Sequence, residues 1–364
     1  MNDGLFRSVI AWASPSVAGS DVERPSCVLD AGAWNDLTSM AVDQRVIGLL
    51  WHAIEAGMPV TPLQRVGAAT MAHDSMLNVV ALEATAQWAV DLLSDAGIDV
   101  RLIKGLATAH TVHTNPRLRD SGDVDLLVLP AQFVAAQLVM AAAGLPTEVR
   151  WGSGATGFLK EQVFVTDDGI EIDLHQSLNF GERWRRLTPL LMRNGLRVAT
   201  DAGSPGPTFS TLSIEGLFVS AAISASRSDA RMSGFLDVAA ISRDERLDSA
   251  RLTALVDAVG LGPAIVPVLE RVGRYFSIGE PATDTIARSR SSVLDVACSR
   301  IEQSENGARY LYSCLSGPAR QWGPGLRALL LPDQAHFECD PRRGGRVRRL
   351  ASQSVAMLAP RTWR

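Results

Sequence analysis

The chain has 364 residues, of which 46% are hydrophobic and 20% are charged, and its formal net charge is -4. This size and apolar content suit two or three domains with a sizeable core, and the negative balance gives no global attraction to nucleic acid. The four cysteines form no CxxC pair, no apolar run approaches the ~20 residues of a membrane span, and the N-terminus lacks a secretory pattern. We therefore expect a cytoplasmic protein without a membrane partner.

The first part of the chain has helical periodicity. Apolar residues recur at helical spacing from residue 31 to about residue 96, and Gly97 is a suitable residue to end the last helix. The pattern then changes to a strand over residues 98–103. We expect a loop at residues 104–107, followed by a short helix through Val112.

A second strand is predicted over residues 123–129, after a polar stretch at 116–122. Pro130 suits the first turn of a helix that ends at Gly144. Residues 158–166 and 170–174 have the pattern of strands, and the Asp-Asp-Gly between them predicts an antiparallel hairpin. After about Pro189 no strand pairs stand out, and residues 212–224, 235–241 and 252–276 are predicted to be helical.

These elements predict an α+β fold with a mixed-sheet core between two helical regions. The expected division is a helical region over residues 1–96, a core over 97–188, a helical domain over 189–338, and a basic, flexible tail over 339–364 that contains Arg342, Arg343, Arg346, Arg348 and Arg349.

Three aspartates are the candidates for chemistry. Alternation along a strand places Asp123 and Asp125 on one face, with Cα atoms about 7 Å apart. Asp173 shares a face with Glu171 and His175, and it would join the pair if its strand lay beside the first. Three carboxylates could hold two Mg²⁺ ions, because carboxylate oxygens are the ligands that this hard cation prefers.

The arrangement resembles a bacterial nucleotidyltransferase family within the DNA polymerase beta-like superfamily. The resemblance is carried by Lys104-Gly105, Arg119, Asp123-Val124-Asp125-Leu126-Leu127-Val128 and Ile172-Asp173-Leu174-His175, and it extends more weakly from about Leu37 to about Ile241. Haloacid dehalogenase-type phosphatases and metal-dependent glycosyltransferases carry a DxD motif at the end of an apolar strand, whereas here the apolar run Leu126–Leu129 follows the carboxylates, which favours a nucleotidyltransferase.

The resemblance implies roles for these residues. Asp123, Asp125 and Asp173 would ligate Mg²⁺, and Asp173 would also be a candidate base. Gly105 would let the backbone approach the phosphates of a nucleoside triphosphate, Lys104 would add a positive charge there, and Arg119 would steady a phosphate or the carboxylates. His175 would either orient Asp173 or be a satisfied structural histidine.

The implied activity is transfer of a nucleoside monophosphate from a triphosphate to a hydroxyl or phosphate, with release of pyrophosphate. A peptide natural product or small metabolite is the favoured acceptor, and an RNA acceptor, which the basic tail could contact, stays open. Leu106 follows Gly105 where related proteins often have serine or glycine. This departure keeps a catalytically inactive binding or scaffold protein as an alternative, beside a phosphotransferase that moves the γ-phosphoryl group.

Overall fold

A computed structural model describes residues 26–145, 147–148, 160–179, 181–199, 208–227, 230–280, 282–284 and 292–302, together with Val9 and Ala13. The predicted basic tail over residues 339–364 lies outside these residues. In the described part of the chain, no helix has both the length and the apolar character needed to cross a membrane.

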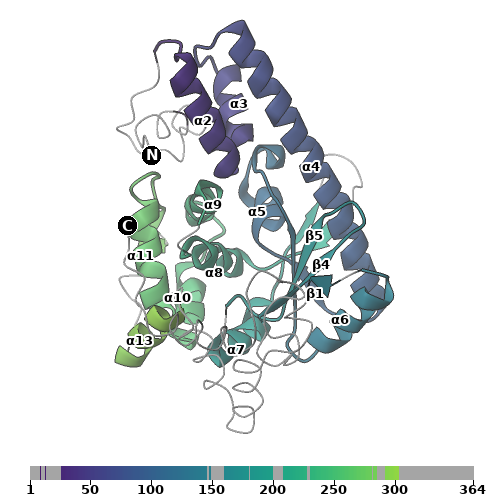
Figure 1. The fold of residues 1–364 in the computed structure, drawn as a ribbon. Helices are drawn as coiled ribbons and strands as arrows, with labels where there is room; N and C mark the ends of the chain where they lie inside the picture. The colour runs from purple at the N-terminus through teal and green to yellow at the C-terminus, as the bar shows by residue number, and fades with distance from the viewer. Residues whose placement is uncertain are drawn as a thin grey trace, which may run out of the picture.

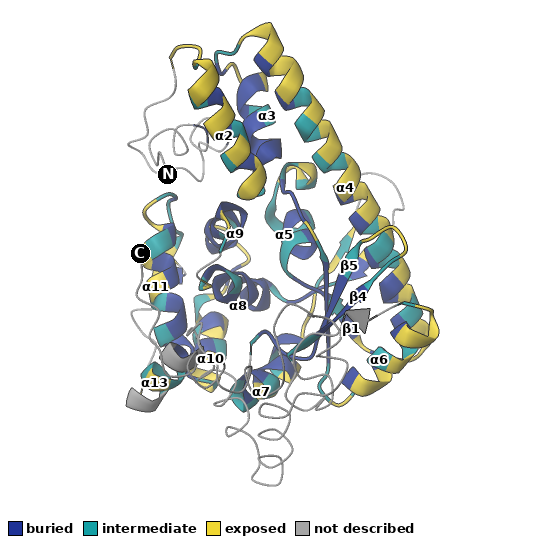
Figure 2. Ribbon diagram, in the orientation of Figure 1, coloured by how far each residue is buried: buried dark blue, intermediate teal, exposed yellow. Residues whose placement is uncertain are grey.

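Three helices precede the sheet, as the periodicity predicts. They are α2 (Ala31–Asp43), α3 (Ile47–Glu55) and the long α4 (Pro62–Asp95). Thr61 caps α4 with a reciprocal capping box to Gln64, which satisfies donors that the first turn would leave unpaired. Buried Val79, Leu82 and Ala86 lie on the inner face of α4, and its outer face is largely exposed (Figure 2).

The core is a five-stranded mixed sheet with the order β1-β2-β5-β4-β3. Its strands are β1 (Val100–Leu102), β2 (Val124–Val128), β3 (Thr147–Glu148), β4 (Glu161–Val165) and β5 (Glu171–His175). β4 and β5 form the predicted antiparallel hairpin, and Gly169 takes the positive φ of 81° at its turn. β2 and β5 run parallel, which places the two acidic strands side by side.

Helices lie on both sides of this sheet (Figure 1). α4 and α6 (Phe133–Ala142) lie along one side, and α5 (Lys104–Val112) lies on the other, toward the C-terminal helices. The predicted helix from Pro130 begins at Phe133, and its C-terminal turn includes Gly144 with a φ of 85°. The fold is thus the α+β architecture that the sequence predicts.

The expected loop at residues 104–107 is wrong, because these residues form the first turn of α5. Ile103 is extended and takes the N-cap position, and Lys104 has a φ of 54°, so the chain turns from strand into helix within two residues. Leu106 and Ala107 are each 2% exposed, so burial of this first turn stabilises a helix that Lys-Gly alone does not predict.

The absence of strand pairs after Pro189 is also wrong. β6 (Arg197–Ala199) and β7 (Thr208–Ser210) pair antiparallel, and Thr211 forms a bridge to Leu102 at the edge of the main sheet. These strands have three residues each, which is too short for alternation to be detected. Along the chain, α7 (Glu182–Leu191) follows the β4–β5 hairpin and precedes the β6–β7 pair.

The described elements after β7 are helices. They are α8 (Ile214–Ala225), α9 (Met232–Ser242), α10 (Ser249–Ala258), α11 (Gly262–Val272) and α13 (Val293–Glu302). The single helix predicted over residues 252–276 is two, divided at Gly260 with a φ of 65°. α8 and α9 are buried on nearly all sides (Figure 2) and pack against α5, which carries the start of the candidate site. The expected domain boundaries stay a prediction.

Candidate active site

Parallel pairing of β2 and β5 brings two of the predicted aspartates together. Asp125 and Asp173 are direct partners in the strand register, so their side chains leave the same face of the sheet. Both are buried, at 4% and 8% exposure. Ligand atoms of Asp125, Asp173 and His175 all lie within 4.8 Å of one another. Sheet pairing therefore gathers acidic groups from strands almost 50 positions apart.

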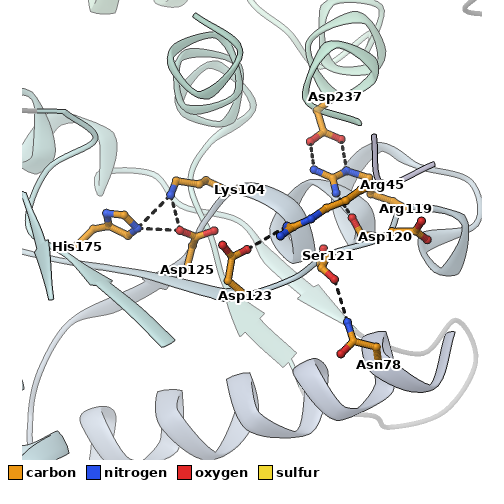
Figure 3. Close-up of polar contacts among 10 residues, drawn as sticks. All are labelled: Arg45, Asn78, Lys104, Arg119, Asp120, Ser121, Asp123, Asp125, His175 and Asp237. Carbon is orange, nitrogen blue, oxygen red and sulfur yellow. Dashed lines mark hydrogen bonds and ion pairs between the residues drawn. The ribbon is translucent and has the colours of Figure 1, made fainter. Parts of the chain in front are cut away.

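Lys104 and His175 both contact the carboxylate of Asp125 (Figure 3). The Lys104 ammonium hydrogen-bonds Asp125 Oδ1 and lies 3.1 Å from His175 Nε2, which is itself 2.8 Å from the same oxygen. Burial by itself would raise the pKa of Asp125, but Lys104 and His175 more than offset it and hold that pKa well below its usual range. Asp125 is therefore ionised.

His175 is a neutral partner in this cluster. Burial and the nearby Lys104 lower its pKa, so it is uncharged near neutral pH. Its Nδ1 atom lies 3.1 Å from Glu161 Oε2 on the neighbouring strand. A carboxylate only accepts, so the neutral ring carries its proton on Nε2 to bond Asp125 Oδ1 at 2.8 Å, and Nδ1 makes no hydrogen bond among the described residues. His175 thus lies between Asp125 and Glu161.

Asp123 lies at the rim of the same face. It precedes β2, and its side chain is 34% exposed. Its Oδ1 atom lies 3.5 Å from an Arg45 guanidinium nitrogen, and Asp123 is not in the close group of Asp125, Asp173 and His175. Figure 3 shows Asp123 and Asp125 side by side, with Arg45 approaching Asp123 from the other direction.

Asp173 has an unusual proton affinity. Burial, with the negative charges of Asp125 and Glu161, raises its pKa to about 7, and its Oδ1 atom has no hydrogen-bond partner among the residues that the structure describes. A carboxyl group with such a pKa can take up a proton near neutral pH. The unpartnered oxygen also fits a cation ligand, because a buried acceptor without a partner is costly unless something binds it.

We expect a pH-dependent difference in stability between the wild-type protein and Asp173→Asn. From about pH 5 to pH 7 folded Asp173 keeps a proton that the unfolded chain has released, so raising the pH destabilises only the wild type, by up to about 1.4 kcal/mol per unit. The low pKa of His175 gives the opposite slope, but both proteins share it and it cancels in the difference.

Urea unfolding in the presence of a chelator at several pH values measures this difference. Asp168→Asn, which makes the same change in the exposed turn of the hairpin, should follow the wild type at every pH. A constant difference between wild type and Asp173→Asn across the range would contradict the raised pKa.

Arg119 is paired with a residue of the C-terminal helices. It donates two hydrogen bonds to Asp237 on α9, at 3.0 Å from Nε and 2.7 Å from the terminal nitrogen. His113 lies 3.0 Å from the same carboxylate. Arg119 and Asp237 are 7% and 4% exposed. This buried pair fixes the segment that leads into β2 against α9.

The neighbouring Asp120 anchors the same segment to the N-terminal helices. Its carboxylate accepts hydrogen bonds from the backbone N–H of Ile47, at the start of α3, and from Ser75 on α4. Asn78 donates to the carbonyl of Ser121. The approach to Asp123 is therefore held from both sides.

A pocket of about 390 Å³ opens over this face of the sheet. Its charged lining residues are five basic and three acidic: Arg45, Lys104, Arg119, Arg227 and Arg231, and Asp123, Asp125 and Asp237. Gly105 and Ser121 also line it, whereas Asp173, the strand partner of Asp125, is not among the lining residues. A pocket with more basic than acidic groups above a pair of carboxylates suits a polyanion bound together with divalent cations.

The sequence-predicted residues are distributed as follows. Asp125, Asp173, His175 and Lys104 meet in one cluster, Gly105 and Arg119 line the adjoining pocket, and Asp123 lies at the rim. Sequence reasoning missed Arg45, Glu161 and Asp237 as members of the site. Asp237 lies within the weaker part of the family resemblance, whereas no sequence signal distinguishes Arg45 from the other arginines of this chain.

Comparisons with known proteins are informative at the level of the family. A family model described as "Uncharacterised nucleotidyltransferase" matches residues 30–277. A search of curated proteins gave no match.

Solved structures are only distantly similar. An antigenic nucleotidyltransferase-like protein from Paracoccidioides brasiliensis has 13% identity and a TM-score of 0.34, and the match covers 62% of this chain and 97% of that one. A structure titled "Structure of tRNA-processing enzyme complex 3" has 9% identity and a TM-score of 0.23, with 74% and 86% coverage. The family match spans more than half of the chain and includes every residue of the site, so this protein belongs to the uncharacterised nucleotidyltransferase family.

Proposed function

We propose that the protein transfers a nucleoside monophosphate from a nucleoside triphosphate to a hydroxyl or phosphate group of an acceptor. One observation carries the proposal: Asp125 and Asp173 stand in register on adjacent parallel strands, beside a pocket with an excess of basic groups. An oxygen of the acceptor would attack the α-phosphorus, the bond from that phosphorus to the β-phosphate oxygen would break, and pyrophosphate would leave.

Each residue has a proposed part in this reaction. Asp173 would take the proton of an acceptor hydroxyl. Lys104 and the pocket arginines would bind and orient the phosphates, and buried His175 would hold Asp125 and Lys104 in place.

A divalent cation fits the acidic cluster, because Asp173 Oδ1 is buried without a partner and lies near the ionised Asp125. We propose that Asp125, Asp173 and Asp123 would hold Mg²⁺, two ions in all, with His175 as a neighbour. When bound, Mg²⁺ would neutralise phosphate charge and increase the electrophilicity of the α-phosphorus.

Transfer assays with all four nucleoside triphosphates test the function. Each α-labelled triphosphate would be incubated with Mg²⁺, the protein and candidate acceptors, with pyrophosphate measured and acceptors examined by mass spectrometry. We propose a peptide natural product or small metabolite as acceptor, on the family resemblance alone. A nucleoside diphosphate product would indicate a phosphotransferase instead, and neither binding nor transfer with any triphosphate would contradict the proposal.

A further inference from the structure

One wall of the pocket is built from three segments that are far apart in the sequence. The turn between α2 and α3 carries Gln44 and Arg45, and Gln44 accepts hydrogen bonds from the backbone N–H groups of Met232 and Ser233 at the start of α9. The third segment is Ser121–Gly122, just before β2. The N-terminal and C-terminal helices therefore meet at this wall, and Arg45 and Arg231 both line the pocket.

Arg45 is held in an unfavourable position. Its φ is 55°, a value that residues with side chains rarely adopt. Lys104, which lines the same pocket, has a similar φ of 54°. A Cβ atom at position 122 would lie 2.0 Å from an Arg45 guanidinium nitrogen, so a larger residue there would displace the guanidinium from its place beside Asp123. Backbone and neighbour together direct the Arg45 guanidinium over Asp123.

Positive charge accumulates around Arg45. Burial lowers its pKa, Asp123 opposes that effect, and the like charges of Arg231 and Arg119 lower the pKa further. Arg119 forms a close, buried ion pair with Asp237, at 2.7 Å. Arg45 has a longer contact of 3.5 Å with Asp123, and both of those side chains are partly exposed. Two neighbouring cations that line a pocket are stabilised when an anion binds between them.

Ser121 adds a hydroxyl group that has no partner in the described structure. It is 6% exposed, it lines the pocket, and its Oγ atom lies 2.7 Å from the position that a Cβ on Gly105 would take. Gly105 belongs to the first turn of α5, and the N-cap residue of this helix makes no side-chain hydrogen bond to that turn. Leu106, which follows Gly105, is buried and apolar. The Ser121 hydroxyl thus lies against the first turn of α5, beside Gly105.

We propose that Arg45, Ser121 and Arg231 form an anion subsite for the terminal phosphate of the triphosphate substrate. This inference rests on the proposed function, because it places the α-phosphate near Asp125 and Asp173 and the end of the phosphate chain at the wall of the pocket. The subsite makes the protein selective for a triphosphate over a diphosphate. The arginine guanidinium groups and the serine hydroxyl would donate hydrogen bonds to the terminal phosphate, which a diphosphate lacks.

Calorimetric titration with each of the four nucleoside triphosphates and its matching diphosphate in Mg²⁺ buffer tests the subsite. Arg45→Gln should weaken binding of the triphosphate by about tenfold to a hundredfold and Ser121→Ala by about threefold to tenfold, with much smaller effects on the nucleoside diphosphate. Arg231→Gln changes an exposed residue and tests the subsite without disturbing the core.

Two matched controls accompany these variants. Ser220→Ala removes another buried, unpartnered hydroxyl that does not line the pocket, and Arg251→Gln removes an arginine whose side chain is 75% exposed on α10. Equal weakening in test and control variants, or wild-type binding no tighter for the triphosphate than for the nucleoside diphosphate, would overturn the subsite. The transfer assays with nucleoside triphosphates decide the proposed function separately, because they measure product and not selectivity.

Discussion

Replacement of Asp173 by asparagine should reduce nucleotidyl transfer by a factor of about 10³ or more while leaving the fold intact. At neutral pH this carboxyl is near its midpoint of ionisation, so asparagine resembles its protonated form in size and charge. The variant keeps the Lys104–Asp125–His175 cluster and the pocket, and should still bind a nucleoside triphosphate. It loses the group that takes up the acceptor proton and offers an unpartnered oxygen to a cation.

The measurement is the single-turnover rate of transfer, with triphosphate affinity determined on the same preparation. Asp168→Asn, in the exposed turn of the same hairpin, should transfer at the wild-type rate. Transfer by Asp173→Asn at near the wild-type rate would remove Asp173 from the reaction. Wild-type protein that binds the triphosphate with the same affinity as Asp173→Asn, but forms no product with any acceptor, would favour the scaffold alternative.

The second large effect is expected on stability. Asp237→Ala should lower the free energy of unfolding by about 3–5 kcal/mol, because it leaves the buried Arg119 guanidinium without its carboxylate. This is a large share of the ~5–15 kcal/mol that typically separates folded from unfolded proteins. Asp244→Ala is the matched control, since Asp244 pairs with a half-exposed Arg246 and should cost about 1 kcal/mol or less.

Urea unfolding followed by circular dichroism measures both variants. The double variant Arg119→Met with Asp237→Leu should recover much of the lost stability, because apolar groups can replace a buried ion pair of similar volume. A cost for Asp237→Ala no larger than that for Asp244→Ala would mean that Arg119 finds another partner or reaches water.

Local patterns were sufficient to predict the two strands that carry or adjoin the candidate aspartates. The alternation in Asp123–Leu129 and the turn residues before Asp173 identify two strands, each with carboxylates on one face. The structure pairs these strands in parallel and aligns Asp125 with Asp173, as the aspartate set requires. Local patterns failed at residues 104–107 and after Pro189, where a buried helical turn and very short strands are stabilised by contacts with distant residues.

The sequence by itself determined the chemical groups and the faces of the strands that carry them, because side-chain alternation and turn preference act over a few neighbouring residues. Only the tertiary structure decided their partners. It pairs Lys104 with Asp125 and Asp237 with Arg119. It also packs the turn that carries Arg45 against the start of α9, where both line the pocket. These contacts join residues from 21 to 188 positions apart, and they depend on the packing of whole helices and strands, which no local pattern records.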